Sequence, residues 1–375
     1  MSKETVAFFS LLRSGLWGNG NPDIGIDGTT DWNFIYQLAQ EQSVQGLLLQ
    51  GIEEMRAKGI ELNVPKVLLL QWIGEVQVIE QRNKGMNVFL AELIEKLRKE
   101  DIYTILVKGQ GIAQCYEKPL WRCSGDIDLF LSEENYQKAK PFLMPLATSV
   151  EEEYIREKHL GLTIDGWVVE LHGHLYSGLS SSVERELDKF QEDTFYGGQV
   201  RSWLNGQTQL FLLKAENDAF YVFTHIMQHF FKEGVGLRQI CDWCRLLYTY
   251  RDSLNYGLLE KRIRRAGLMS EWKAFFNLAS RYLGMPDLGS GLMVHDSRYD
   301  KKADRIMEFI LKSGNMGHNR DMSHFNKYPY LLRKCVSMGR RIGDLINHAR
   351  IFPLDSLRFF PRIMFNGVRS AMKGE

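Results

Sequence analysis

The sequence has little of what would set it apart from an ordinary globular protein. Its 47 Lys and Arg residues balance 46 Asp and Glu residues in a chain of 375, so no overall charge attracts a polyanion such as nucleic acid. Five cysteines, an odd and sparse set, exclude a disulfide framework. No apolar run approaches the roughly 20 residues that a membrane helix needs. We therefore expect a cytoplasmic protein with no integral membrane segment and with no nucleic acid as its partner.

Hydrophobic spacing divides the chain into three regions. Residues 1–100 carry apolar residues at helical spacing and predict an N-terminal helical region. Residues 101–205 carry short β-type runs and predict an α/β core with a small mixed sheet. Residues 206–375 turn helical again, with Leu210 to Gln228 and Val235 to Tyr250 as the first two predicted helices. The sequence thus predicts an α+β protein whose sheet lies between two helical regions.

An Asp-Gly pair, Asp165-Gly166, joins two β-type runs in the middle region. The pair favours a two-residue type I′ hairpin turn, because both turn positions need a positive φ. A hairpin with that turn has one wholly apolar face, and its other face carries Glu170 opposite Gly161. Glu170 then projects from an otherwise apolar strand, with room at Gly161 for another group to approach. An edge hairpin whose polar face simply meets water is the alternative.

A second predicted strand begins with an Asp-x-Asp pair, Asp126 and Asp128. The period-two geometry of a strand places both carboxylates on one face and Ile127 and Leu129 on the other. Two neighbouring carboxylates repel each other unless a cation lies between them, so the pair is suited to bind a hard metal ion. A solvated strand end that binds no metal is the alternative.

The segment Lys108-Gly109-Gln110-Gly111 ends a β-type run and opens a predicted helix. A glycine turn exposes backbone N–H groups that can bind phosphate, aided by the helix N-terminus and by the charge of Lys108. The segment matches neither a P-loop nor a dinucleotide-binding motif. We therefore regard these four residues as candidates for phosphate binding, with an ordinary strand-to-helix turn as the alternative.

The order of these pieces resembles the DNA polymerase β-like nucleotidyltransferases. Within that superfamily, the chain looks like an uncharacterised bacterial nucleotidyltransferase family that is often associated with surface-polysaccharide gene clusters. In the core, the resemblance is carried by Leu106-Val107-Lys108-Gly109, Tyr116, Pro119, Arg122, Asp126-Ile127-Asp128-Leu129 and Val169-Glu170-Leu171-His172. In the helical part, it is carried by His225, His229, Gly236-Leu237-Arg238 and Asp242. Lys108-Gly109 stands where the superfamily usually has a Gly-Ser pair.

The resemblance implies a metal-dependent transfer of a nucleoside monophosphate from a nucleoside triphosphate to an acceptor hydroxyl. Asp126 and Asp128 would bind two Mg²⁺ or Mn²⁺ ions, and Glu170 would complete the catalytic triad of acids. Lys108 would act as a point charge on the phosphates, and Arg122 would bind a phosphate or the acceptor through two hydrogen bonds. The acceptor could be a sugar, a phosphosugar or a protein side chain, and the residues do not select among these.

The histidines near these acids allow more than one role. The hairpin register places His159 opposite His172, on the same face as the third acid. Both are candidates for contacts with substrate, for transition-metal ligands, or for plain polar packing. His225 and His229 lie at i, i+4 on one predicted helix face. These two histidines either contact the nucleotide or form hydrogen bonds in the core. Arg238 is a further candidate for contact with the nucleotide.

Two other functions fit the same residues. A metal-dependent hydrolase could be built on Glu170, His159, His172 and His174, and it would retain zinc, iron or manganese on purification. A non-catalytic member of the fold would bind nucleotide or a partner protein without turnover.

The last region ends in a basic and apolar tail from about Leu331 onward. Its cationic residues include Arg333, Lys334, Arg340, Arg341, Arg350, Arg358, Arg362 and Arg369. A basic amphipathic helix can lie on an anionic membrane surface, so weak membrane-surface contact is one hypothesis. A solvated charged face is the other.

Overall fold

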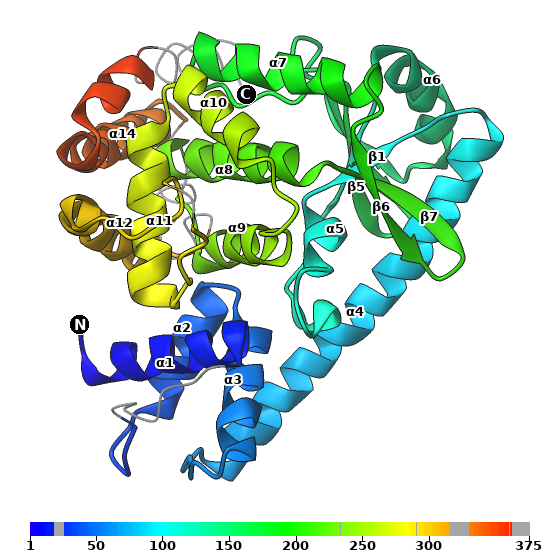
Figure 1. Cartoon of the computed structure of the whole chain (residues 1–375). Helices are drawn as coiled ribbons and strands as arrows, with labels where there is room; N and C mark the ends of the chain where they lie inside the picture. The colour runs from blue at the N-terminus through cyan, green and yellow to red at the C-terminus, as the bar shows by residue number, and fades with distance from the viewer. Residues whose placement is uncertain (19–25, 233, 290, 316–329, 360, 362–375) are drawn as a thin grey trace.

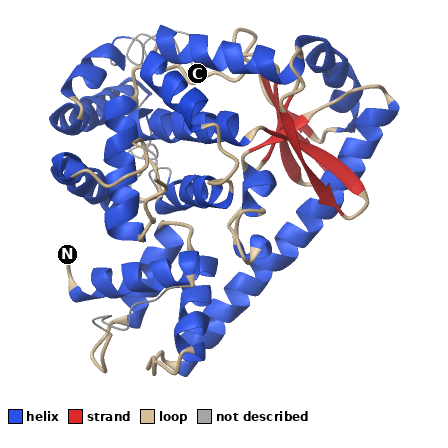
Figure 2. Ribbon diagram, in the orientation of Figure 1, coloured by secondary structure: helices blue, strands red, loops and turns tan. Residues whose placement is uncertain are grey.

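The computed structural model describes residues 1–18, 26–232, 234–289, 291–315, 330–359 and 361. Helices at both ends of the chain flank one mixed β-sheet, so the predicted α+β class is confirmed (Figures 1 and 2). The long helix α4 (Lys66–Lys99) runs from the N-terminal helices to the sheet (Figure 1). Its 34 residues span about 50 Å. Among the described residues, no helix has the length and apolar character needed to cross a membrane.

Three helices precede α4: α1 (Lys3–Trp17), α2 (Trp32–Glu41) and α3 (Gln45–Ala57). Helices α1 and α3 cross closely because glycines lie at the crossing point. A Cβ on Gly15 would lie 2.0 Å from the carbonyl oxygen of Leu47, so a larger residue would push the helices apart. The N-terminal helices also contact the C-terminal ones, since the Trp17 indole donates a hydrogen bond of 2.6 Å to the carbonyl of Leu283.

The sheet has seven strands in the order β3-β4-β5-β2-β1-β7-β6. The strands are β1 (Ile105–Val107), β2 (Ile127–Phe130), β3 (Ser149–Val150), β4 (His159–Ile164), β5 (Trp167–His172), β6 (Val200–Asn205) and β7 (Thr208–Leu213). The β1–β7 and β2–β5 pairs are parallel and the other four pairs are antiparallel. The prediction of a mixed sheet is therefore confirmed.

The β4–β5 hairpin has the predicted register. Asp165 and Gly166 form its turn with φ values of 51° and 80°, as a type I′ turn requires. Glu170 pairs with Gly161, and His172 pairs with His159. The alternate residues of both strands form the predicted apolar face, which is buried against α4 and α6 (Glu133–Leu143). The opposite face of the sheet is thereby left for polar residues.

The predicted helix from Leu210 to Gln228 is wrong at its start. Residues 208–213 form β7, which pairs with β1 and β6, and the helix α8 (Ala215–Lys232) begins only after it. The cause is a second hairpin, in which Asn205 pairs with Thr208 and the two-residue turn is Gly206-Gln207, with φ 62° at the glycine. A turn of the Gly-X type is a local hairpin signal. The apolar run of β7 is compatible with a helix or with a strand. Its pairing with the central strand β1 makes it a strand.

The remaining described helices pack around an aromatic core. They are α7 (Ser181–Phe195), α9 (Leu237–Thr249), α10 (Tyr256–Ala266), α11 (Met269–Leu283), α12 (Asp300–Ser313) and α14 (Tyr330–Ile351). Fully buried Phe223, Trp243 and Trp272 contact one another with ring centroids 4.7 to 5.3 Å apart. Helix α14 contains the first residues of the basic tail, whereas Arg362 and Arg369 lie outside the described residues.

Candidate active site

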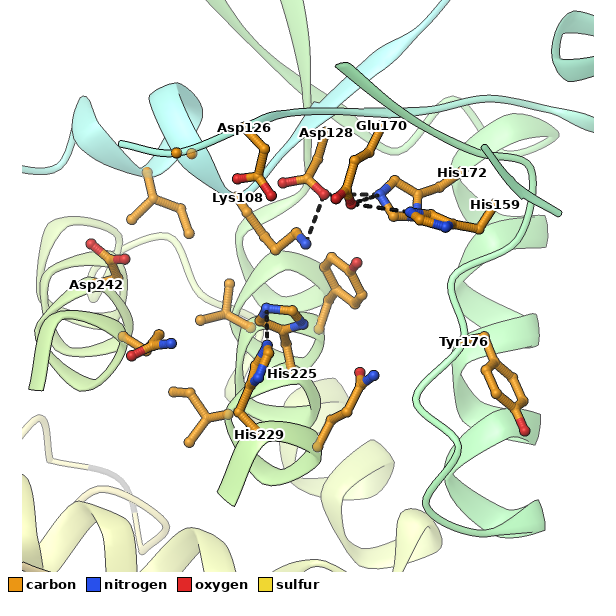
Figure 3. Close-up of a pocket in the computed structure, with 18 of the residues that line it drawn as sticks. Lys108, Asp126, Asp128, His159, Glu170, His172, Tyr176, His225, His229 and Asp242 are labelled. Carbon is orange, nitrogen blue, oxygen red and sulfur yellow. Dashed lines mark hydrogen bonds and ion pairs between the residues drawn. The ribbon is translucent and has the colours of Figure 1, made fainter. Parts of the chain in front are cut away.

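Strand pairing brings the three predicted acids together. Asp128 on β2 pairs with Glu170 on the parallel strand β5, and Asp126 immediately precedes β2. One carboxylate oxygen from each of the three lies within 4.8 Å of the others. Ile127 and Leu129 point the opposite way and are buried in the apolar cluster. The three acids project together from the polar face of the sheet, toward a cavity of about 490 Å³ (Figure 3).

The charges of this cluster are strongly coupled. The neighbouring charge of Asp128, together with burial, raises the pKa of Asp126 above its ordinary value. Burial alone would also raise the pKa of Glu170, but hydrogen bonds from His159 and His172 hold it below its usual range. Repulsion from an adjacent carboxylate raises the proton affinity of an acid, and a cation bound between the two carboxylates removes that repulsion. The donor set therefore fits hard divalent cations such as Mg²⁺ and Mn²⁺.

Lys108 supplies the closest cation within the chain. Its Nζ lies 2.7 Å from Oδ1 of Asp128. Burial would lower the pKa of Lys108, but attraction to Asp128, Tyr221, Asp126 and Glu170 together outweighs it and raises the pKa above its ordinary value. The residue has φ 56° and ψ −145°, a region that is almost confined to glycine and is strained for lysine. The backbone thus holds a charged side chain in a strained conformation beside the acids.

Two histidines complete the sheet side of the cavity. His172 Nε2 lies 2.8 Å from Oδ1 of Asp128 and 3.4 Å from Oε2 of Glu170. His159 Nε2 lies 3.1 Å from the same Oε2. Burial would lower the pKa of His172, but its hydrogen bonds to the carboxylates raise it. His174, in contrast, turns to Asp188 on α7, at 2.7 Å.

The space predicted opposite Glu170 is filled from within the chain. A Cβ on Gly161 would lie 2.4 Å from the carboxylate of Glu151, whose backbone N–H bonds to the Gly161 carbonyl. A side chain at position 161 would therefore displace Glu151. Glycine here admits a further acidic side chain to the polar face of the sheet.

The predicted phosphate-binding segment is only partly exposed to the cavity. Lys108 and Gly109 line it. Gln110 instead contacts Asn83, at 3.2 Å, and belongs to a buried polar network. Gly111 packs against Leu212, where a Cβ would lie 2.8 Å from a methyl carbon. Phosphate contacts in this segment would thus come from Lys108 and from backbone N–H groups.

Arg122 lines the cavity, but its guanidinium is engaged in an ion pair. Its Nε and Nη2 each lie 2.7 Å from one carboxylate oxygen of Asp242 on α9. Tyr116 donates a further hydrogen bond of 2.8 Å to the same carboxylate. Burial would lower the pKa of Arg122, but the Asp242 charge raises it. The two hydrogen bonds that were predicted to bind phosphate are made to Asp242 instead, and they join α9 to the segment before β2.

Helices α8 and α9 form the opposite side of the cavity. Tyr221, His225 and His229 follow one face of α8, and the last two are 3.0 Å apart between their Nε2 atoms (Figure 3). Burial, followed by the charge of Lys108, lowers the pKa of His225 well below its ordinary value, so its imidazole is neutral. Arg238 on α9 also lines the cavity. The structure therefore brings all five predicted histidine and arginine contacts to one cavity, three of them on the helices.

Sequence reasoning missed several lining residues, among them Tyr176, Tyr221 and Lys232. Of these three, Tyr221 and Lys232 could have been found. Tyr221 precedes His225 by four residues and Lys232 follows it by seven, so all three share one helix face. Tyr176 comes from the loop after β5, where no periodic pattern indicates the direction of a side chain.

Comparison with known proteins agrees with this geometry. Residues 28–284 match the model of a family described as an uncharacterised nucleotidyltransferase. The matched range includes the whole sheet together with α8 and α9. Searches of curated proteins and of solved structures found no match.

Proposed function

Because the chain belongs to this family of uncharacterised nucleotidyltransferases, we propose that it transfers a nucleoside monophosphate from a nucleoside triphosphate to an acceptor hydroxyl. The observation that carries the proposal is the group of three carboxylates, Asp126, Asp128 and Glu170, within 4.8 Å at the edge of a large cavity. Mg²⁺ or Mn²⁺ held there would neutralise the triphosphate and polarise its α-phosphorus.

The chain's own residues would bind and orient the substrates. Lys108 would exchange its contact with Asp128 for the phosphates of the donor, since both partners are anionic oxygens. Backbone N–H groups at the start of α5 (Gly109–Ala113) would add hydrogen bonds to the same phosphates. Glu170 would take the proton of the acceptor hydroxyl as its oxygen bonds to the α-phosphorus and the bond from that phosphorus to the leaving pyrophosphate breaks.

The helix side of the cavity would hold the acceptor. Neutral His225 can accept a hydrogen bond from a hydroxyl group, and Arg238 can bind an anionic group of the acceptor. These groups suit a sugar, a phosphosugar or a hydroxyl side chain of a protein. A link to surface-polysaccharide metabolism would follow if the acceptor is a sugar.

Isothermal titration calorimetry with each of the four nucleoside triphosphates, with and without Mg²⁺, tests the proposal. We expect metal-dependent binding by the wild-type protein that is lost in the Asp126→Asn/Asp128→Asn double variant. Asp188→Asn, which changes an acid outside the cluster, should bind as the wild type does. A positive result identifies the donor for an acceptor screen that monitors pyrophosphate release. Absence of binding for all four triphosphates would contradict the proposal and favour the hydrolase.

A further inference from the structure

The polar face of the sheet carries two adjacent rows of metal-binding side chains. One row contains Asp128 and Glu170, which are paired across β2 and β5. The next row contains His172 and His159, which are paired across β5 and β4. Both rows lie on the same face, because His172 follows Glu170 by two residues on one strand. Carboxylates and imidazoles thus form one continuous strip of ligands, with Glu170 at the boundary.

We infer that His159, His172 and Glu170 form a second divalent-cation site, selective for a borderline metal such as Co²⁺, Cu²⁺ or Zn²⁺, beside the site formed by Asp126, Asp128 and Glu170. Glu170 would be shared between the two. Its Oε2 already faces both imidazoles (Figure 3). His172 Nε2 also lies 2.8 Å from Oδ1 of Asp128, and a bound ion would take the place of that contact.

The geometry of the three side chains fits a common metal ion. Ligand atoms placed about 2.1 Å from one ion are separated from each other by about 3.0 to 3.5 Å in octahedral or tetrahedral coordination. The observed separations from Glu170 Oε2 are 3.1 Å to His159 Nε2 and 3.4 Å to His172 Nε2. All three ligand atoms lie within 4.8 Å of one another. An ion could therefore be bound with only small side-chain movements.

The choice of metal follows from the ligand chemistry. Imidazole nitrogen binds Fe²⁺, Co²⁺, Cu²⁺ and Zn²⁺ well, whereas Mg²⁺ and Mn²⁺ prefer oxygen ligands and Mg²⁺ retains water. Two histidines and one carboxylate leave further coordination positions open. Those positions would face the cavity, which all three side chains line. The bound ion could then contact a substrate directly.

A purely positioning role makes a different prediction. In that case His159 and His172 would only hold Glu170 in place through hydrogen bonds, and no bound metal would be coordinated by nitrogen. The two roles are distinguished by the ligand atoms of a bound ion, and this measurement needs no nucleotide and no knowledge of the acceptor.

Electron spin-echo envelope modulation with Cu²⁺ as the probe provides the test. The full-length protein is stripped of metal with a chelator and given one equivalent of Cu²⁺ in the absence of nucleotide. We expect modulation from ¹⁴N of coordinated imidazole. His159→Gln should weaken Cu²⁺ binding at least about tenfold and remove one nitrogen coupling. His174→Gln, a matched change of a histidine that pairs with Asp188, should change neither.

The carboxylate variant separates the two sites. Asp126→Asn should weaken Mg²⁺ binding yet preserve the nitrogen coupling to Cu²⁺. Failure to bind one equivalent of Cu²⁺, or a bound Cu²⁺ with oxygen ligands only, would overturn the inference. Nitrogen coupling that survives in both His159→Gln and His172→Gln would overturn it as well. Because nucleotide is omitted throughout, a failure of the proposed transfer reaction would leave this result intact, and the reverse also holds.

Discussion

The two walls of the cavity differ in both structure and charge. The sheet wall consists of Asp126, Asp128, Glu170, His159 and His172, and the ionisable group of each lies within 4.8 Å of at least two others. The helix wall consists of Tyr221, His225, His229, Lys232 and Arg238, from α8 and α9. Strand pairing fixes the direction of the side chains of the sheet wall, because a one-residue slip of register would turn them to the other face of the sheet. The helix wall depends on how α8 and α9 pack.

Burial affects the two walls in opposite ways. On the sheet wall, hydrogen bonds from His159 and His172 hold the pKa of Glu170 low in spite of burial. On the helix wall, burial keeps His225 neutral and raises the pKa of Tyr221. The cluster of acids suits metal ions, whereas the neutral groups of Tyr221 and His225 suit hydroxyl groups. The difference supports the proposal that the donor and the acceptor bind to different walls.

The largest expected effect comes from Asp128→Asn. The variant removes one of the two paired acids of the sheet wall, and we expect a loss of about 10³-fold or more in kcat/KM, which equals about 4 kcal/mol. Mg²⁺ affinity measured by calorimetry should fall with it. Asp188→Asn serves as the control and should retain full activity. An Asp128→Asn enzyme within tenfold of the wild type would exclude the sheet wall as the metal site.

The next effect concerns the base of the helix wall, where Asp218 of α8 is buried beside Arg201 at 2.5 Å. Burial raises the pKa of Asp218 from 3.8 to about 6, although Arg201 opposes the shift. Between these values the native state holds a proton that the unfolded chain releases. The free energy of unfolding should therefore fall as the pH rises through this window, by roughly 3 kcal/mol at most.

Denaturant unfolding between pH 4 and pH 7 measures this dependence. Asp218→Asn cannot titrate at this position and should flatten the fall, whereas Asp188→Asn, at an exposed position, should leave it in place. The same slope in Asp218→Asn and in the wild type would show that other groups cause the pH dependence.

His225→Gln tests whether the helix wall binds substrate without taking part in metal binding. Loss of the neutral imidazole should lower kcat/KM about tenfold, which corresponds to one hydrogen bond of about 1.4 kcal/mol. Mg²⁺ affinity should stay unchanged, in contrast to Asp128→Asn. A parallel loss of Mg²⁺ binding would mean that the two walls do not act separately.

Local sequence patterns predicted the sheet wall well. The Asp-Gly turn and the alternation of β4 and β5 fixed the pairing of Glu170 with Gly161, and Asp-x-Asp spacing fixed the direction of Asp126 and Asp128. Each of these depends on residues only a few positions apart. The resemblance to a known family then ordered the pieces, and the family match agrees with it.

The rest depends on packing between distant segments. The pairing of Arg122 with Asp242 joins residues 120 positions apart, and nothing in either local pattern indicates it. The same holds for Glu151 beside Gly161, where the sequence indicated free space and the structure supplies a carboxylate. The spacing of apolar residues indicates which face of a helix or strand is buried, but not which other segment of the chain packs against that face.

The smallest effect tests the strain at Lys108, the residue that lies between the two walls. Lys108→Gly and Lys108→Ala both remove the ion pair with Asp128, so their difference in stability isolates the backbone. Glycine adopts φ 56°, ψ −145° with little strain, whereas alanine is strained there by roughly 1 to 3 kcal/mol. The greater entropy of glycine in the unfolded chain offsets part of this. We expect the glycine variant to be the more stable by about 1 kcal/mol in denaturant unfolding.

The control is the same pair of substitutions at Glu92, an exposed position inside α4. There alanine should be the more stable by about 1 kcal/mol, because glycine is unfavourable in a helix interior. The reversal of the order between the two positions is the signature of strain at Lys108. If alanine is the more stable at both positions, the backbone at position 108 relaxes once the ammonium is gone. The strain would then be imposed by the contact between Lys108 and Asp128 rather than by the fold, and the sheet wall would owe its geometry to its charges.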